Sequence, residues 1–130
     1  MQDSARIREE FLNFFVERGH FLAPSSGLIP ENDPTVLFTT AGMQQFRRFY
    51  IFPEESANKR ITTSQKCIRT GDIDSVGDET HLTFFEMLGN FSFGFDKYPD
   101  SYFKEEAILM GWQFLTEKLM IDKKRIYATY

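Results

Sequence analysis

The 130-residue sequence has little cysteine, no excess of positive charge and no long hydrophobic run. Its single cysteine, Cys67, excludes an internal disulfide and a cysteine-based zinc site, and it fits a reducing compartment. The formal net charge of −4 argues against a broad basic surface for nucleic acid, so any such contact should be local. No apolar run approaches the roughly 18 residues of a membrane span. Together with a polar N-terminus, this predicts a soluble, cytoplasmic protein with no membrane partner.

Two common nucleotide-binding signatures are also absent. Neither G-x-x-x-x-G-K-[ST] nor G-x-G-x-x-G occurs, which disfavours the P-loop and dinucleotide-binding folds. The sequence does contain abundant apolar and aromatic residues, with 42% hydrophobic residues and fifteen Phe, too many for a disordered chain. The length predicts one domain. So many Phe suggest surfaces that need a neighbour, including possible self-association of the chain.

The predicted elements follow the order of an α+β fold. Apolar residues at helical spacing predict helices over residues 4–18 and 101–118, the first capped by Asp3 or Ser4 and the second by Asp100 or Ser101, and a short helix or turn over 43–50. Apolar, β-branched and aromatic runs predict strands over 20–23, 35–40, 60–69, 82–88 and 126–130. Turn-rich segments over 24–34 and 71–79 predict loops. The strands over 60–69 and 82–88 should form an antiparallel hairpin. Because the last strand runs to the final residue, we expect the chain to be part of a larger domain.

The hairpin carries a predicted site for a nucleotide. Arg69 leaves a strand just before a loop, where its guanidinium could grip phosphate oxygens or pair with a nearby acid. His81 lies where the loop returns. In a strand that rises about 3.3 Å per residue, His81 and Phe85 share one face some 13 Å apart, enough to span a nucleotide from phosphate to base. Phe84 lies on the opposite face and is predicted to be core, and Glu86 would need a bulge to reach the ligand.

Three residues outside this site have both a structural and a functional interpretation. Arg47 and Arg48 could form a basic spot for RNA phosphate, although a solvated polar face is the commoner outcome. His20 is expected to be a structural or surface histidine rather than a ligand.

Several runs of the sequence resemble the N-terminal catalytic region of the alanyl-tRNA synthetases. They are Phe11 to Phe15 with Gly19-His20, Pro24-Ser25-Ser26, Asp33 to Phe46, Gln65-Lys66-Cys67-Ile68-Arg69 and, most specifically, Thr83 to Gly94 with Tyr102-Phe103-Lys104. The resemblance covers essentially all 130 residues. It implies a class II synthetase fold, an antiparallel sheet flanked by helices, that is incomplete at Tyr130. Motif 1 would span about residues 4–40 and motif 2 about residues 60–88.

The resemblance also implies a reaction and its participants. Alanine and ATP would give alanyl-adenylate and pyrophosphate, and the alanyl group would then pass to the 3′ end of tRNA(Ala). Arg69 would be the catalytic residue that holds the α-phosphate, His81 would bind the β/γ end, and Phe85 would stack on adenine, with Glu86 in the same ATP site. For tRNA, the candidate contacts are Arg47 and Arg48, which come from the basic spot described above and not from the resemblance. Magnesium would bridge the phosphates, and no zinc is expected in this segment.

Three features depart from the family pattern. The chain lacks a Gly-Gly-Lys-His-Asn-like run after Arg69, and a usual pair of histidines before Thr-Phe-Phe is His81-Leu82 here. Motif 3, the alanine-selecting pocket and the editing domain with its zinc would lie beyond Tyr130. Two hypotheses follow: the chain is the amino-terminal piece of an aminoacylation domain, or it is a non-catalytic relative that binds nucleotide, tRNA or a protein partner.

Overall fold

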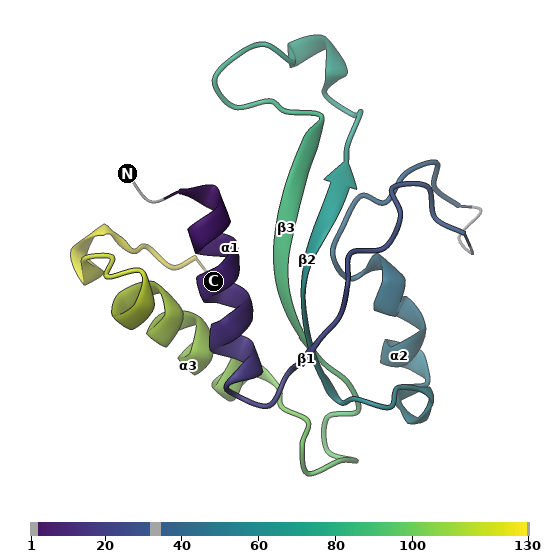
Figure 1. Cartoon of the computed structure of the whole chain (residues 1–130), viewed down its shortest axis with the longest axis vertical. Helices are drawn as coiled ribbons and strands as arrows, with labels where there is room; N and C mark the ends of the chain where they lie inside the picture. Colours follow the sequence, from purple (N-terminus) through teal and green to yellow (C-terminus); the bar gives the residue numbers. More distant parts are fainter. Residues whose placement is uncertain (1–2, 32–34, 130) are drawn as a thin grey trace.

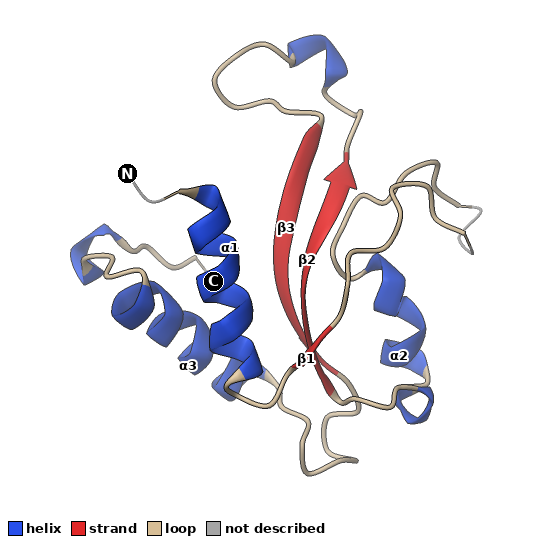
Figure 2. Ribbon diagram, viewed as in Figure 1, coloured by secondary structure: helices blue, strands red, loops and turns tan. Residues whose placement is uncertain are grey.

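The computed structural model describes residues 3–31 and 35–129, which form a three-stranded sheet with helices on both sides (Figures 1 and 2). The helices and strands are α1 (Ser4–Val16), β1 (Phe21–Leu22), α2 (Arg47–Ile51), β2 (Arg60–Ile68), β3 (Phe84–Ser92) and α3 (Lys104–Gln113). A π-helical turn over Phe114–Lys118 continues α3, and short 3₁₀ turns cover Gln44–Phe46, Pro53–Glu55, Ile73–Ser75 and Lys123–Arg125. The predicted α+β class with flanking helices is confirmed.

The sheet is mixed and is dominated by one long hairpin. The strand order is β1-β2-β3, with β1 parallel to β2 and β2 antiparallel to β3. The β2–β3 register is unbroken from Arg60 opposite Ser92 to Ile68 opposite Phe84. The predicted hairpin is therefore confirmed, and β3 continues to Ser92, four residues beyond the predicted end at Leu88. Because side chains alternate along strands, odd-numbered residues of both strands share one face and even-numbered residues share the other.

Helix α1 lies against the even-numbered face with α3 beside it on the same side of the sheet, and α2 lies on the opposite side of the hairpin (Figure 1). The Asp3 side chain caps α1 by accepting a hydrogen bond from the Ala5 N–H at 3.3 Å, as predicted. Gly19 follows the helix with a φ of +80°, a conformation that glycine adopts without steric cost.

Two apolar clusters hold the layers together. One joins α1 and α3 to the even-numbered face and contains Phe11, Phe14, Phe15, Tyr102, Met110 and Phe114. The other joins α2 to the odd-numbered face and contains Ala23, Phe46, Ile61 and Phe93. Each fully buried side chain of this size stabilises the fold by roughly 1.5–3 kcal/mol relative to exposure. Both clusters lie toward the Arg60–Ser92 end, which we call the base of the hairpin; the Ile68–Phe84 end and its loop are the tip.

A buried hydrogen-bonded chain ties α1 to the base of the hairpin. His20, which is 4% exposed, contacts the Phe15 carbonyl oxygen through Nδ1 at 3.0 Å and the Tyr102 hydroxyl through Nε2 at 2.8 Å. A carbonyl can only accept, so Nδ1 carries the proton and donates, and the Tyr102 hydroxyl donates to Nε2. Asn90 Nδ2 donates to the same hydroxyl at 2.9 Å. The prediction that His20 is structural is confirmed, and its burial lowers its pKa to about 4.

Some sequence predictions of secondary structure are wrong. Residues 35–40 form no strand. Their backbone makes one hydrogen bond with β2, in which the Thr39 carbonyl accepts from the Ile68 N–H at 2.9 Å, and a single bond does not make a ladder. Residues 126–129 also form no strand, and Tyr127 is 89% exposed. Helix α3 begins at Lys104 without a side-chain cap, because the Ser101 hydroxyl instead donates to the carbonyls of Gly94 and Tyr98. The parts of the predictions that fall on residues 32–34 and 130 lie outside the described residues.

Candidate active site

The backbone closes the hairpin tip at Arg69 and Thr83. The Arg69 N–H donates to the Thr83 carbonyl oxygen at 2.9 Å, one residue beyond the last paired position of β2. Residues 70–82 therefore form the loop at the top of the hairpin in Figure 1. This loop contains one 3₁₀ turn, Ile73–Ser75, and its side chains are almost all exposed. Any ligand at this end of the sheet is consequently accessible from solvent.

Arg69 and Phe85 come together at this tip. The Arg69 Cζ atom lies 5.1 Å from the centroid of the Phe85 ring. Arg69 Nε donates to the Thr40 carbonyl oxygen at 3.0 Å, and no other hydrogen bond of this guanidinium is present within the described residues. The two terminal nitrogens can thus face a ligand. A guanidinium beside an aromatic ring offers a phosphate group two parallel donors and offers a planar base a surface for stacking.

The loop, rather than a strand, orients His81. Asp78 accepts hydrogen bonds from the N–H groups of Thr80 and His81 at 2.8 and 2.7 Å, and its other carboxylate oxygen lies 2.7 Å from His81 Nδ1. These bonds, led by the backbone donors, lower the pKa of Asp78 to about 2. Because β3 begins only at Phe84, the 13 Å spacing predicted for His81 and Phe85 on one strand does not apply.

Glu86 faces away from Phe85. The register pairs Phe85 with Cys67 and Glu86 with Lys66 without a bulge, so the two side chains lie on opposite faces. Glu86 Oε2 accepts from Arg8 of α1, at 2.5 Å from Nη2 and 3.0 Å from Nε. Phe84 shares the face of Glu86 and is 50% exposed, so the prediction that Phe84 is core is wrong. The apolar cluster around α1 includes Leu88 of β3 and does not include Phe84.

The segment 39–45 forms a wall beside Arg69. Thr39 is 2% exposed; its N–H donates to the Leu28 carbonyl at 2.8 Å, and its hydroxyl donates to the Gly27 carbonyl at 2.8 Å. The Gly42 N–H points at the Met87 sulfur on β3, 3.1 Å away. The wall is therefore attached both to the preceding loop and to the odd-numbered face of the hairpin.

A buried amide, Gln65, anchors this wall to β2. It is 0% exposed, and its Oε1 accepts from the Ser26 N–H, the Ser26 hydroxyl and Gln45 Nε2 at 2.9–3.0 Å. Its Nε2 donates to the carbonyls of Ser26 and Lys66. This role of Gln65 was not predicted from the sequence. The neighbouring odd positions, Thr63 and Cys67, are equally buried, but this burial is visible only in the structure, so no sequence signal marked Gln65.

Arg47 and Arg48 belong to α2, which lies beside the lower half of the hairpin in Figure 1. Arg48 forms an ion pair with Glu55, and both arginines are exposed. The structure does not bring them to Arg69, which follows the opposite end of β2.

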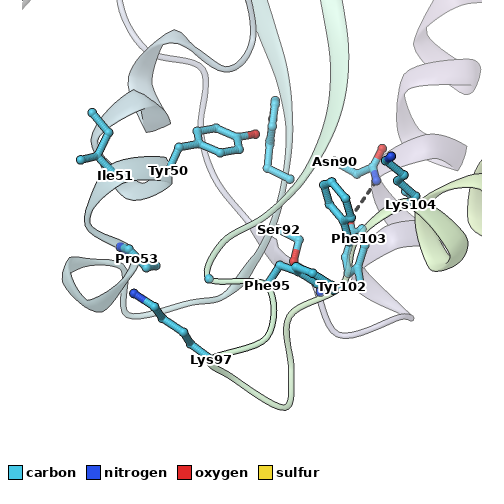
Figure 3. Close-up of a pocket in the computed structure, with 13 residues that line it drawn as sticks. Tyr50, Ile51, Pro53, Asn90, Ser92, Phe95, Lys97, Tyr102, Phe103 and Lys104 are labelled. Carbon is cyan, nitrogen blue, oxygen red and sulfur yellow. Dashed lines mark hydrogen bonds between the residues drawn. The ribbon is translucent and has the colours of Figure 1, made fainter.

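A pocket of about 540 Å³ lies at the base of the hairpin, between the end of α2 and the start of α3 (Figure 3). Tyr50 approaches it from α2, Phe95 and Phe103 come from the segment that follows β3, and Asn90 bonds to Tyr102 beside it. None of the predicted nucleotide-binding residues lines this pocket. The predicted site and the pocket are therefore at opposite ends of the hairpin.

No helix within residues 3–31 and 35–129 is long and apolar enough to cross a membrane. No group of three or more His, Cys, Asp and Glu side chains in the same residues could hold a metal ion.

Comparison with known proteins connects this geometry to a family. A family model described as tRNA synthetases class II (A) matches residues 6–130. The alanine–tRNA ligase of Rubrobacter xylanophilus is 55% identical over 126 residues, which cover 97% of this chain and 14% of the relative. Alanine–tRNA ligases of Dehalococcoides mccartyi and Legionella pneumophila are 50% and 51% identical over 99% and 97% of this chain, again covering 14% of each relative. The chain thus spans about one seventh of the length of these relatives, and the resemblance found in the sequence is confirmed. Because the family model covers nearly the whole chain, the chain belongs to the class II (A) family of tRNA synthetases.

Proposed function

We propose that this chain is part of a larger catalytic domain that uses ATP to activate alanine and transfers the alanyl group to tRNA(Ala). The observation that carries the proposal is the pairing of Arg69 with Phe85 at an open hairpin tip, 5.1 Å apart. It supplies a cation for phosphate and a ring for adenine in one place. The three relatives compared above, which match 97–99% of the chain, are named alanine–tRNA ligases, which favours alanine as the amino acid.

In the proposed first step, a carboxylate oxygen of alanine attacks the α-phosphorus of ATP. A bond forms between that oxygen and phosphorus, the bond to the bridging oxygen breaks, and pyrophosphate leaves with its electron pair. Arg69 binds the α-phosphate and stabilises the negative charge that accumulates on its oxygens in the transition state. In the second step, the 3′-terminal ribose of tRNA(Ala) takes the alanyl group and AMP leaves. In this reaction the protein contributes positioning and charge stabilisation more than proton transfer.

The other predicted ATP contacts are supported unequally. His81 is proposed to bind the β/γ end of ATP; its Nδ1 is engaged by Asp78, which leaves Nε2 for a phosphate oxygen. Phe85 is proposed to stack on adenine, a contact worth roughly 1–3 kcal/mol per base. Glu86 stays a prediction without geometric support, because its carboxylate is paired with Arg8 on the other face.

The remaining assignments complete the proposal. Motif 1 would occupy about residues 4–40 and motif 2 about residues 60–88, with motif 3 and the editing domain in other parts of the protein. Arg47 and Arg48 are proposed to contact the tRNA backbone. Mg²⁺ would be held by phosphate oxygens of ATP, since the described residues contain no acidic or histidine cluster for it. We place the protein in the cytoplasm, where tRNA is charged.

The test is alanine-dependent exchange of pyrophosphate into ATP by the full-length protein. Arg69→Ala is expected to lower kcat by about 10²–10³-fold, the usual effect of removing one charge-stabilising donor. Arg6→Ala is the matched control, because Arg6 is an exposed arginine paired with Glu10 on α1. Exchange that Arg69→Ala leaves unchanged would remove Arg69 from its role. No alanine-dependent exchange in the unaltered protein would favour the non-catalytic binding module instead.

A further inference from the structure

The orientation of Arg69 depends on a single backbone carbonyl. Its Nε donates to the Thr40 oxygen at 3.0 Å, while its Cζ lies over the Phe85 ring. These two contacts fix the position of an otherwise exposed guanidinium and leave its two terminal nitrogens without a hydrogen bond within the described residues. A guanidinium grips phosphate through that planar fork, so its orientation matters as much as its charge.

The Thr40 carbonyl belongs to a short turn that one side chain holds. Gln44 Oε1 accepts from the Thr40 N–H at 2.9 Å, and the Gln44 N–H donates to the Ala41 carbonyl at 3.2 Å. The preceding residue, Thr39, is fixed on both sides by bonds to Leu28 and Ile68. Apart from Arg69, Gln44 is therefore the one side chain among the described residues that hydrogen-bonds to the Thr40 backbone.

The turn itself is anchored to the hairpin. Gln45, the next residue, donates through Nε2 to the buried Gln65 of β2 at 2.9 Å. A continuous path of hydrogen bonds and adjacent residues thus runs from Gln65 through Gln45, Gln44 and the Thr40 backbone to Arg69. All of it lies on the odd-numbered side of the sheet, the side of Phe85.

We propose that Gln44 is a positioning residue for alanine activation: its amide oxygen holds the Thr40 carbonyl in the place where that carbonyl orients the Arg69 guanidinium. The inference rests on the proposed function of Arg69. It assigns Gln44 no contact with substrate. The Gln44 Nε2 atom is buried and makes no hydrogen bond within the described residues, so the oxygen is the part of the amide that does this work.

The test compares Gln44→Met with its matched control Gln113→Met in the full-length protein. Methionine keeps the length of the side chain and removes the amide, and Gln113 is the last residue of α3, far along the chain from the tip. Gln44→Met should lower kcat of alanine-dependent ATP–pyrophosphate exchange about tenfold with a smaller change in KM for ATP, because Arg69 acts mainly in the transition state. Gln113→Met should change neither parameter.

A double-mutant cycle with Arg69→Ala separates positioning from general destabilisation. If Gln44 acts through Arg69, Gln44→Met should have no further effect in the Arg69→Ala background. An equal loss in both backgrounds, or no loss in Gln44→Met alone, would overturn the inference while leaving the proposed role of Arg69 intact. If Arg69→Ala itself leaves exchange unchanged, the proposed role fails and the inference fails with it.

A conservative variant keeps the test decisive if Gln44→Met folds poorly. Gln44→Glu retains an oxygen to accept from the Thr40 N–H, and it replaces a nitrogen that has no partner within the described residues with a second oxygen and a negative charge beside the Arg69 guanidinium. Its kcat should stay within about threefold of the unaltered protein, since the acceptor is preserved. A loss in Gln44→Glu as large as that of Arg69→Ala would contradict the assignment of the oxygen.

Discussion

The base and the tip of the β2–β3 hairpin differ in how far their side chains are buried. At the base, Phe93 is 1% exposed, and the buried bond from Asn90 to Tyr102 leads on to His20. At the tip, Arg69 and Phe84 are exposed, and the loop is fixed mainly by the carboxylate of Asp78. At the base the side chains are buried, and at the tip the charged and aromatic groups stay accessible. One hairpin thus divides stability and chemistry between its two ends.

The largest expected effect breaks the base. Phe93→Ala should lower the free energy of unfolding by about 3–5 kcal/mol, because it removes a ring packed against those of Phe46, Phe49 and Tyr50. Urea unfolding followed by circular dichroism measures this. The control is Phe84→Ala at the tip, which should cost less than about 1 kcal/mol because half of that ring is already in water. Similar losses in the two variants would erase the distinction between base and tip.

A smaller effect comes from the buried polar chain. Tyr102→Phe should lower the free energy of unfolding by about 1–3 kcal/mol, since it leaves His20 Nε2 without a donor and Asn90 Nδ2 without an acceptor. The exposed Tyr127 provides the control, and Tyr127→Phe should change stability by less than about 0.5 kcal/mol. Thermal and urea unfolding that cannot distinguish Tyr102→Phe from this control would show that the hydroxyl contributes nothing to the base.

The pH dependence of stability sharpens the same contrast. Burial lowers the pKa of His20 from its ordinary 6.5 to about 4, so between these values the unfolded chain binds more protons than the folded one. The contribution of His20 is therefore complete above pH 6.5 and is lost as the pH falls toward 4. His20→Gln should flatten this part of the curve in urea titrations from pH 7 to 4. A wild-type curve that stays flat over that range would contradict the buried neutral imidazole.

Asp78 at the tip responds in a different pH range. Its pKa is lowered from 3.8 to about 2 by donors of Thr80 and His81, so the stabilisation it provides is present above pH 3.8 and disappears only below that value. The two ends of the hairpin are therefore expected to lose stability in separate windows of pH. Titration of His20 can be followed without interference from Asp78.

Much of the framework was predictable from local sequence pattern. The helix at residues 4–16 follows from its apolar periodicity, and the hairpin of residues 60–68 with 84–88 follows from two runs rich in apolar, β-branched or aromatic residues on either side of a turn-rich loop. The strand predicted over 35–40 was wrong because apolar residues such as Leu37 also occur in loops that are tied down by a few backbone bonds. Phe84 was misplaced for a related reason: alternation gives the face of a residue but not how far along that face the covering helix reaches.

The site was predictable in its residues and less so in its geometry. Arg69 and Phe85 are neighbours in space because a strand end and its antiparallel partner meet there, which the hairpin pattern implies. The position of His81 could not be predicted, because it depends on a loop organised by Asp78 rather than on strand spacing. The Gln65 anchor depends on contacts between segments 39 residues apart, and such contacts leave no local periodic signal.

The most direct test of the division between tip and base is the kcat of alanine-dependent ATP–pyrophosphate exchange, measured for Arg69→Ala and Tyr102→Phe in the full-length protein at a temperature where both are folded. The account predicts a loss of about 10²–10³-fold for Arg69→Ala and a kcat within about twofold of the unaltered protein for Tyr102→Phe, although Tyr102 lines the pocket at the base. Exchange that survives Arg69→Ala but is lost in folded Tyr102→Phe would place the chemistry at the base and contradict it.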